Sequence, residues 1–477
     1  MAQIIIREKD LTGAPAESTF DVAVVPGLVS NTSFTDFEKP IYFNTLASFK
    51  SVIGDTPVVL TGDGISYTLS EGSITCPAAA GASDVHYFFA SGELDPGYIY
   101  ASELLTLGMP IYYLPIDATQ AQGVYDRLEG ANNVKSVLLQ LVDRGTYNIK
   151  YITSGGYPTF EYNENSIAKL MLQVAGAIND ETDDYGDDPT VDHPNGRGDA
   201  VALIDHFEVD DRPLVGDNSV FGRINGSDAC SLVDANFLSY GAMFTPYAKY
   251  KLANNYKIED ELVSTAYLPA SFAYLTCLAK QLNGILPTYQ AIAGVGRGSV
   301  TNISFETATN SYAMCTKEVL TNYIANYYNI PMKAGVGPEG KLISINAITQ
   351  INPYGMVIYG DRTLKEKDPI DGVKATGVLP IRAMVCDIKK QMYQTARRYM
   401  FSPNNEALWI NFRNGVTGLL NQMQSGYGIK RYTLTKDMAK STKNALYVNC
   451  SIVPIYPVEK FDITIEITDE DIEVNEA

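Results

Sequence analysis

Residues 385–423 read VCDIKKQMYQTARRYMFSPNNEALWINFRNGVTGLLNQM. The Ser402-Pro403 pair divides this stretch, because proline is tolerated in the first turn of a helix but interrupts a helix interior. Each half therefore predicts a helix. Apolar residues recur at helical spacing in the second half and give it one core-facing stripe. The stripe consists of Leu408, Phe412, Val416, Leu420 and Met423, and we expect Trp409 to be a core residue beside Phe412.

Three strand-like segments follow these helices. Gly426 and Gly428 end the second helix, and Ile429–Thr435 and Ala445–Val453 then have the composition of strands. In Phe461–Ile467 (FDITIEI) apolar and polar residues alternate strictly, which is typical of a strand with one buried face. Two helices and these strands predict a C-terminal α+β domain.

Upstream of residue 351, strand-like and helix-like segments alternate along the chain. This order predicts an α/β core with several parallel strands. Residues 57–95 are rich in Gly, Ser and Ala with short strand-like stretches, and they predict a small β insertion. Strands are expected at 21–26, 110–116, 200–204 and 342–348, and helices at 45–53, 96–107, 166–178, 268–282 and 319–328.

The length of 477 residues predicts several domains or lobes. We expect a multi-lobed α/β fold with a C-terminal α+β domain and a β-rich insertion. The predicted parts are an arm at 1–20, an N-terminal part of the core at 21–116, a central α/β region at 117–350, a C-terminal domain at 351–460, and a last strand with an acidic tail at 461–477.

The charge is distributed unevenly along the chain. The net charge is −19, which argues against direct nucleic-acid binding by the chain as a whole. Residues 361–460 nevertheless hold 16 basic and 8 acidic side chains, whereas residues 461–477 hold seven acidic side chains and no basic one. A basic segment between acidic ones can orient subunits that assemble with each other and with a partner.

The sequence also indicates the environment in which the chain assembles. Its six cysteines form no CxxC pair and match no zinc spacing, so we expect free thiols in a reducing compartment. The first ten residues lack the pattern of a signal peptide, and no run of about 18 apolar residues predicts a membrane span.

Motifs for catalysis or cofactor binding are weak. Gly335–Lys341 (GVGPEGK) fits most of a phosphate-binding loop, but Leu342 replaces the hydroxyl residue and a strand-like segment follows in place of a helix. Of the three histidines, only His206, beside Asp205 at a predicted strand end, is a candidate for a site role. The acidic run at 180–188 lacks the spacing of a calcium loop. We therefore expect no catalytic residue, cofactor or metal.

A series of motifs in the C-terminal part resembles the contractile tail sheath proteins. Tyr359–Leu364 (YGDRTL) resembles a Gly-x-Arg-Thr-Leu segment of that family, and Arg397–Trp409 resembles its Phe-x-Pro-Asn helix start. The glycine-rich stop at Ser425–Ile429 and the strand Phe461–Ile467 follow in the same order and at similar spacing. The resemblance is weaker upstream and does not extend to residues 57–95 or 117–165.

The resemblance implies a structural protein of a phage or phage-like tail. Subunits would form stacked rings, hexameric in the family, around an inner tube protein, with baseplate and tail terminator proteins at the ends. They would assemble in the cytoplasm of the host bacterium and contract without a nucleotide. The region 117–350 would face outward and 351–460 would face the tube.

The resemblance further implies that terminal strands are donated to neighbouring subunits. The donor residues would be Ile4, Ile5, Ile6, Arg7, Phe461, Ile463, Ile465 and Ile467. The candidates for contact with the tube are Lys389, Lys390, Arg397, Arg398 and Arg413 on the two predicted helices.

Three other functions remain open at this stage. The first is the sheath of a bacterial injection device or tailocin, which uses the same kind of subunit. The second is another self-assembling shell protein. The third is a nucleotide-dependent enzyme built around Gly335–Lys341.

Overall fold

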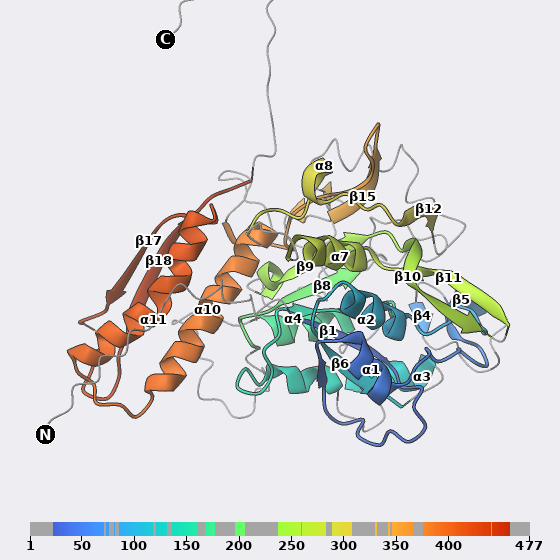
Figure 1. The fold of residues 1–477 in the computed structure, drawn as a ribbon, viewed down its shortest axis with the longest axis horizontal. Helices are drawn as coiled ribbons and strands as arrows, with labels where there is room; N and C mark the ends of the chain where they lie inside the picture. Colours follow the sequence, from blue (N-terminus) through green and yellow to red (C-terminus); the bar gives the residue numbers. More distant parts are fainter. Residues whose placement is uncertain are drawn as a thin grey trace, which may run out of the picture.

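The computed structural model describes most of the chain between residues 22 and 457, and Figure 1 shows its elements. The described residues are 22–70, 73–75, 81, 85–117, 121–130, 136–159, 167–176, 196–205, 237–258, 260–282, 289–307, 330–331, 342–343, 346–365, 375–439 and 441–457.

Eight described strands form one central sheet in the order β16-β15-β9-β8-β7-β1-β6-β2. The six inner strands, from β15 to β6, are parallel, and an antiparallel strand lies at each edge. Inner strands such as β1 and β8 are buried along their whole length, as expected for parallel strands covered on both faces. The strands are β1 (Ala23–Leu28), β2 (Ile41–Phe43), β6 (Ile111–Ile116), β7 (Tyr151–Ile152), β8 (Val201–Asp205), β9 (Gly241–Thr245), β15 (Asn346–Ile351) and β16 (Gly355–Tyr359).

Helices cover both faces of this sheet. On one face, Tyr274 of α7 (Ala270–Leu282) contacts Phe244 of β9, with ring centroids 5.1 Å apart. Three residues earlier in the same strand, Gly241 faces Leu172 of α4 (Ile167–Ala175). Side chains alternate across a strand, so α4 lies on the face opposite α7. The remaining helices of the core are α1 (Leu46–Ile53), α2 (Pro96–Thr106), α3 (Ala121–Tyr125), α8 (Gly294–Arg297) and the short turns η1 (Asp126–Gly130), η2 (Val137–Val142), η3 (Phe237–Tyr240) and η4 (Ala375–Gly377).

Helix α2 approaches β1 so closely that only glycine fits at the crossing. A Cβ atom on Gly97 would lie 2.6 Å from Gly27 Cα and would also overlap the Pro26 carbonyl. Asp95 caps the N-terminus of α2 by accepting from Tyr98 N and also accepts from Leu28 N. One buried carboxylate thus fastens the start of the helix to the end of the strand.

Two smaller sheets project from the core. Strands β3 (Ile65–Ser70), β4 (Ser73–Thr75) and β5 (Val85–Phe89) form the predicted β insertion. Strands β10 (Ala248–Ile258) and β11 (Glu261–Leu268) form a long hairpin that β12 (Ile303–Thr307) extends. This hairpin was not predicted. The prediction of a single strand at 342–348 is wrong. Leu342–Ile343 forms β14 and pairs with β13 (Ile330–Pro331), whereas β15 joins the central sheet.

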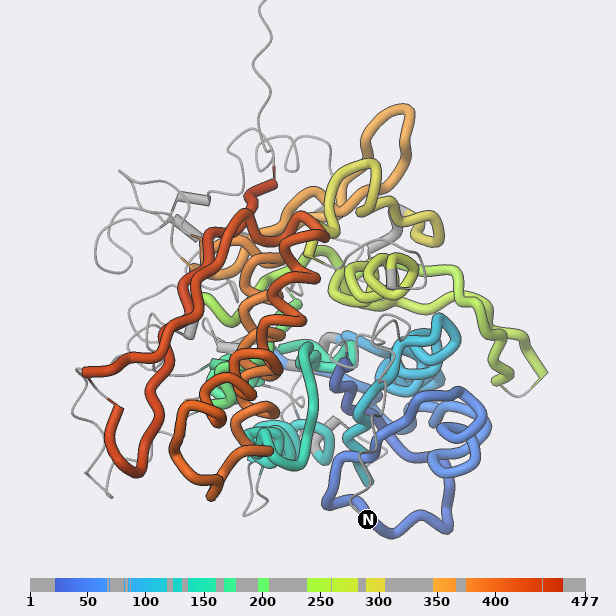
Figure 2. The backbone as a smooth tube through the Cα atoms, turned by 60° about the vertical axis from the view of Figure 1, so that its left-hand side comes forward, coloured from blue at the N-terminus to red at the C-terminus, as the bar shows by residue number. Residues whose placement is uncertain are grey.

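The C-terminal elements form a separate layer along one flank of the core (Figures 1 and 2). Helices α10 (Leu379–Tyr399) and α11 (Glu406–Ser425) lie side by side, and the pair β17 (Ile429–Lys436) and β18 (Val448–Pro454) packs outside α11. The predicted stripe of α11 is confirmed from Phe412 onward, since Val416, Leu420 and Met423 are fully buried in a hydrophobic cluster separate from that of the central sheet, whereas Leu408 is only partly buried. We call these four elements the C-terminal unit.

Candidate assembly interface

The strand pair of the C-terminal unit has open edges. Strands β17 and β18 are antiparallel and hydrogen-bonded to each other, and among the described residues no third strand joins either outer edge. Open edges present unpaired backbone donors and acceptors, which readily accept a further strand. A two-stranded sheet is marginal on its own, so these edges are the natural place for a strand from elsewhere.

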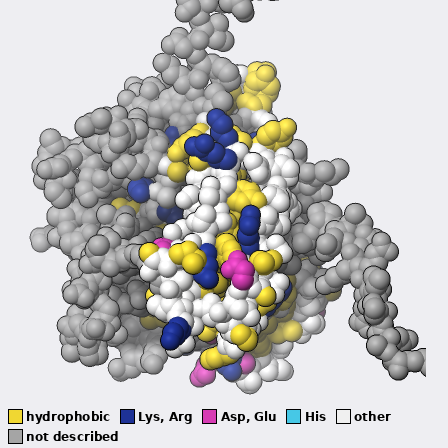
Figure 3. All heavy atoms as spheres, turned by 90° about the vertical axis from the view of Figure 1, so that its left-hand side faces the viewer, with side chains coloured by type: hydrophobic (Ala, Val, Ile, Leu, Met, Phe, Trp, Pro, Cys, Tyr) yellow, Lys and Arg dark blue, Asp and Glu magenta, His cyan; other side chains and the backbone are white. Residues whose placement is uncertain are grey.

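A groove runs between β17 and α11. Its volume is about 680 Å³. It follows β17 from Arg431 to Lys436, and Arg413 and Thr417 of α11 form part of its opposite wall. The groove thus runs along most of one strand. Figure 3 shows this flank of the molecule, on which hydrophobic and basic side chains are intermixed.

The helix-facing side of β18 is incompletely covered. Val448, Cys450 and Ile452 alternate toward the helices and pack against the C-terminal cluster, yet each remains partly exposed. On the helix side, Trp409 and Phe412 stack with centroids 6.4 Å apart and are 9% and 7% exposed. Their predicted place in the core is confirmed. An added strand with one apolar face would cover the remaining apolar surface of β18.

The five basic candidates do not form one surface. Arg397, Arg398 and Arg413 are exposed and available to a partner, and Arg397 donates to the Gly145 carbonyl at 3.1 Å. The other two lie on the side of α10 that faces the core. Lys389 is half-buried, where its ammonium donates to Tyr240 Oη at 2.8 Å.

Lys390 corrects the sequence prediction. Its side chain is 2% exposed, so the prediction that Lys390 contacts a partner is wrong for the folded chain. Burial lowers the pKa of its ammonium from 10.5 to about 8, and the carboxylates of Asp387 and Asp199 oppose that shift. The sequence predicted an exposed side chain because basic residues are mostly exposed. In the fold, α10 is covered on two sides, and Lys390 lies on a covered side.

The contact between α10 and the core is polar and charged. The Lys150 ammonium lies 2.8 Å from Asp387 Oδ2, and both side chains are 1% exposed. The Arg382 guanidinium lies 4.1 Å from the centroid of the Tyr240 ring and donates to the Ser239 carbonyl. We call this contact the polar seam. Sequence analysis missed it, because the partners are 143 to 237 residues apart and leave no local pattern.

Two buried carboxylates in the core have structural contacts. Burial raises the pKa of the Asp95 carboxyl to about 6, although hydrogen bonds from Tyr157 Oη, Tyr98 N and Leu28 N favour the charged form. Burial likewise raises the pKa of Asp205 to about 7, and Asp205 accepts from both the amide and the hydroxyl of Ser271. Both carboxylates are enclosed and bonded to helix starts, so neither is open to a substrate.

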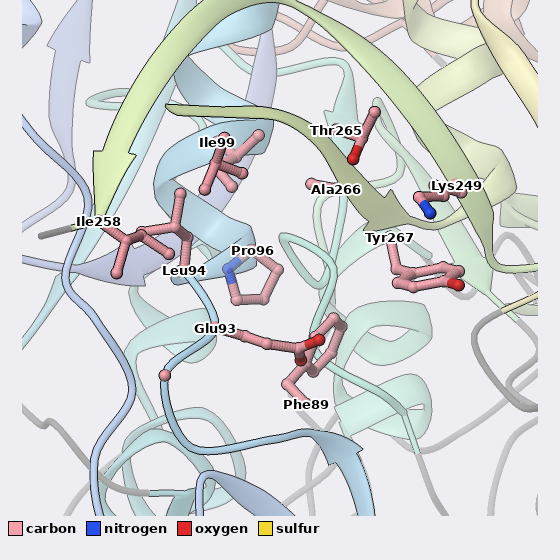
Figure 4. Close-up of a pocket in the computed structure, with 12 residues that line it drawn as sticks. Phe89, Glu93, Leu94, Pro96, Ile99, Lys249, Ile258, Thr265, Ala266 and Tyr267 are labelled. Atoms are coloured by element: carbon pink, nitrogen blue, oxygen red, sulfur yellow. The ribbon is translucent and has the colours of Figure 1, made fainter. Parts of the chain in front are cut away.

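A pocket of about 270 Å³ lies between the β10–β11 hairpin and the start of α2 (Figure 4). Its wall is mainly apolar, with Phe89, Leu94 and Ile99 among the lining residues. Burial raises the pKa of Glu93 at its edge, and Glu93 accepts a hydrogen bond from Ala90 N. Among the described residues that line the pocket there is no histidine or cysteine, and we assign no catalytic chemistry to it.

Several sequence predictions fall on parts of the chain outside the described residues. These are the donor residues Ile4, Ile5, Ile6, Arg7, Phe461, Ile463, Ile465 and Ile467, the loop Gly335–Lys341, the helix at 319–328, the acidic run at 180–188, and His206. Within the described residues, no group of three metal-ligating side chains is found. None of the described helices is both long and apolar enough to cross a membrane.

Comparison with known proteins connects this geometry to a family. Residues 379–468, which include the C-terminal unit, match the family model described as phage tail sheath C-terminal domain. The resemblance stated from the sequence motifs is confirmed for this region. A search of curated proteins finds no significant match.

Solved structures extend the likeness to the whole chain at the level of the fold. A chain of the anti-feeding prophage (AFP) baseplate in the contracted state is 14% identical, with a TM-score of 0.53 over 99% of this chain and 100% of that one. The PVC sheath complex of an extracellular contractile injection system, also contracted, is 13% identical, with a TM-score of 0.52 over 98% of each chain. The contracted AFP helical sheath is 13% identical, with a TM-score of 0.50 over 98% of this chain and 99% of that one. The predicted mixed α/β architecture is therefore that of contractile sheath proteins.

Proposed function

We propose that this chain is the sheath subunit of a contractile tail or phage-like injection device, a structural protein that polymerises around an inner tube and contracts to drive the tube through a target envelope. The observation that carries the proposal is the open-edged β17–β18 pair with its groove, located inside the region that matches the sheath C-terminal domain. The particle would be assembled in the cytoplasm of a host bacterium and attached to a baseplate.

Strand donation would hold the polymer together. The segment Phe461–Ile467 has one strictly apolar face, and Ile4, Ile5 and Ile6 form a second strand-like segment. Backbone hydrogen bonds to the two open edges would give affinity. One donated strand would lie in the groove along β17, and one at β18 would cover its exposed apolar surface. Burial of four such side chains contributes roughly 6–12 kcal/mol before ordering costs. This is enough to keep neighbours joined while the subunits rearrange as rigid bodies.

The exposed arginines are the proposed contacts with the inner tube. Arg397, Arg398 and Arg413 lie on the C-terminal unit, within the basic segment 361–460, whereas the rest of the chain is acidic. The partners would therefore be further copies of the chain, in rings that are hexameric by analogy, a tube protein, and the baseplate and terminator proteins. The likeness to a baseplate chain supports the association with a baseplate.

Electron microscopy of the purified full-length protein tests this proposal. We expect striated hollow tubes, with or without the inner tube as template. A tryptophan in the groove, Thr417→Trp, should shorten or abolish the tubes, because it occupies the space for a donated strand. Deletion of residues 1–10 should do the same.

Asn411→Trp provides the matched control. Asn411 is exposed on the same helix and does not line the groove, so its replacement adds the same bulk elsewhere. Circular dichroism would verify that both variants fold. Monomers of the wild type in the presence of a cognate tube would contradict the proposal, and ATP or GTP binding by such monomers would favour a nucleotide-dependent enzyme.

A further inference from the structure

Two exposed aromatic residues have an unusual backbone conformation. In the described chain, the non-glycine residues with positive φ are Phe401 (φ 65°) and Tyr427 (φ 59°). Both side chains are open to solvent, at 101% and 72% exposure. The left-handed region is unfavourable for bulky residues, and such conformations persist mainly where function requires them. Phe401 lies in the connection between α10 and α11, and Tyr427 lies just after the end of α11.

Tyr427 occupies the position where a helix usually ends in glycine. It follows the cap residue Gly426, and the Tyr427 amide donates to the Gln424 carbonyl at 3.2 Å. The next amide, of Gly428, donates to the Met423 carbonyl at 2.9 Å. Glycine or asparagine would adopt this conformation without strain. A tyrosine here contacts little of its own chain, so its ring is available to another molecule.

Further exposed apolar side chains lie beside Tyr427. The Ile455 amide donates to the Gly428 carbonyl at 3.0 Å, which brings the segment after β18 next to the end of α11. Ile455 and Tyr456 are 40% and 49% exposed. We call Tyr427, Ile455 and Tyr456 the aromatic end. Tyrosine-rich surfaces with polar ring ends are typical of protein interfaces that retain water.

The chain leaves the described structure at this same place. The last described residue is Pro457, and the proposed donor strand begins at Phe461. Four residues span at most about 14 Å when fully extended. A neighbour that accepts this strand must therefore lie directly against the aromatic end of the donor.

We propose that the aromatic end docks against the second copy of the chain that receives the donor strand Phe461–Ile467. This inference rests on the proposed sheath function and names the contact that surrounds the donated strand. The left-handed conformation directs the Tyr427 ring toward that neighbour. The strand supplies the link between the copies, and the aromatic end limits the angle at which they meet.

The polymerisation of a Tyr427→Asn variant tests the inference. Asparagine accepts the left-handed conformation, so the monomer should unfold at the same temperature as the wild type or at a higher one. The critical concentration for tube formation should rise about fivefold or more, as for the loss of an interface aromatic residue. Tyr354→Asn is the matched control, because Tyr354 is a tyrosine of 61% exposure on the β15–β16 turn, which carries no donated segment.

Photo-crosslinking identifies the partner. A benzoylphenylalanine at position 427 should crosslink wild-type tubes into covalent dimers and longer ladders, and the peptide joined to it should come from a second copy. Tubes with an unchanged critical concentration in Tyr427→Asn, or crosslinks to the inner tube or within one chain, would overturn the docking while leaving the sheath function intact. If the wild type forms no tubes even with a template, the sheath function fails and the inference fails with it.

Discussion

The Lys150 ammonium and the Asp387 carboxylate lie 2.8 Å apart, joining the start of β7 to the middle of α10 with both side chains 1% exposed. A buried ion pair adds little to stability by itself, but loss of one partner leaves an uncompensated charge. The pair therefore favours the arrangement in which α10 keeps both charges together against the core.

Neutralising Asp387 should strongly destabilise the protein. Asp387→Asn leaves Lys150 and Lys390 as buried cations, and we expect the free energy of unfolding to fall by about 3–5 kcal/mol. The double variant Lys150→Met/Asp387→Leu should lose less than either single variant. Urea unfolding of the monomer measures the change, and Lys257→Ala, which removes an exposed pair with Asp260, should leave stability nearly unchanged. A negligible loss for Asp387→Asn would mean that water reaches the seam.

Stability should depend on pH through Lys390. The unfolded chain keeps this proton up to about pH 10.5, whereas the folded chain releases it near pH 8. Between these values the unfolded state binds more protons, so the free energy of unfolding rises with pH. The contribution totals about 3 kcal/mol at most, at 1.36 kcal/mol for each pKa unit. Lys390→Met should flatten the slope between pH 7.5 and 9, measured by urea unfolding against wild type; equal slopes would contradict the burial of the ammonium.

A single methyl group on Gly97 should separate α2 from β1. Its Cβ would overlap the Pro26 carbonyl and lie 2.6 Å from Gly27 Cα, and neither backbone atom can rotate away. We expect Gly97→Ala to lower the free energy of unfolding by about 3 kcal/mol or more. Gly418→Ala is the opposite case, because its Cβ would meet nothing within 4 Å on an exposed helix position, and it should stabilise by about 0.5–1 kcal/mol. Similar effects for the two variants would refute the close crossing.

Charge reversal of the exposed arginines should weaken attachment to the inner tube. Arg398→Glu and Arg413→Glu should each lower affinity, and the loss should shrink as ionic strength rises, since exposed charges are screened. Co-sedimentation with preformed tube provides the measurement. Lys257→Glu on the β10–β11 hairpin reverses an exposed charge far from the C-terminal unit and serves as control. Equal binding by all three variants would place the tube contact elsewhere.

Elements with local patterns could be predicted from the amino-acid sequence alone. The stripe from Leu408 to Met423 and the break at Ser402-Pro403 predicted α10 and α11, because helical periodicity and proline act within a few residues. Helix α2 and strands β6 and β8 were predicted for the same reason. The motif series around these helices also predicted the family that residues 379–468 match.

Which surfaces these elements present depends on how the chain folds and could not be predicted from local patterns. Lys389 and Lys390 have the sequence of a solvated helix face, yet Tyr240 contacts Lys389 and the Asp199 carboxylate acts on Lys390 from segments far apart in the chain. No local sequence pattern predicts the exposure of Tyr427 or its left-handed backbone, because both arise from how α11 ends beside Ile455. Burial and charge pairing depend on contacts between distant segments, and a sequence read locally does not contain those contacts.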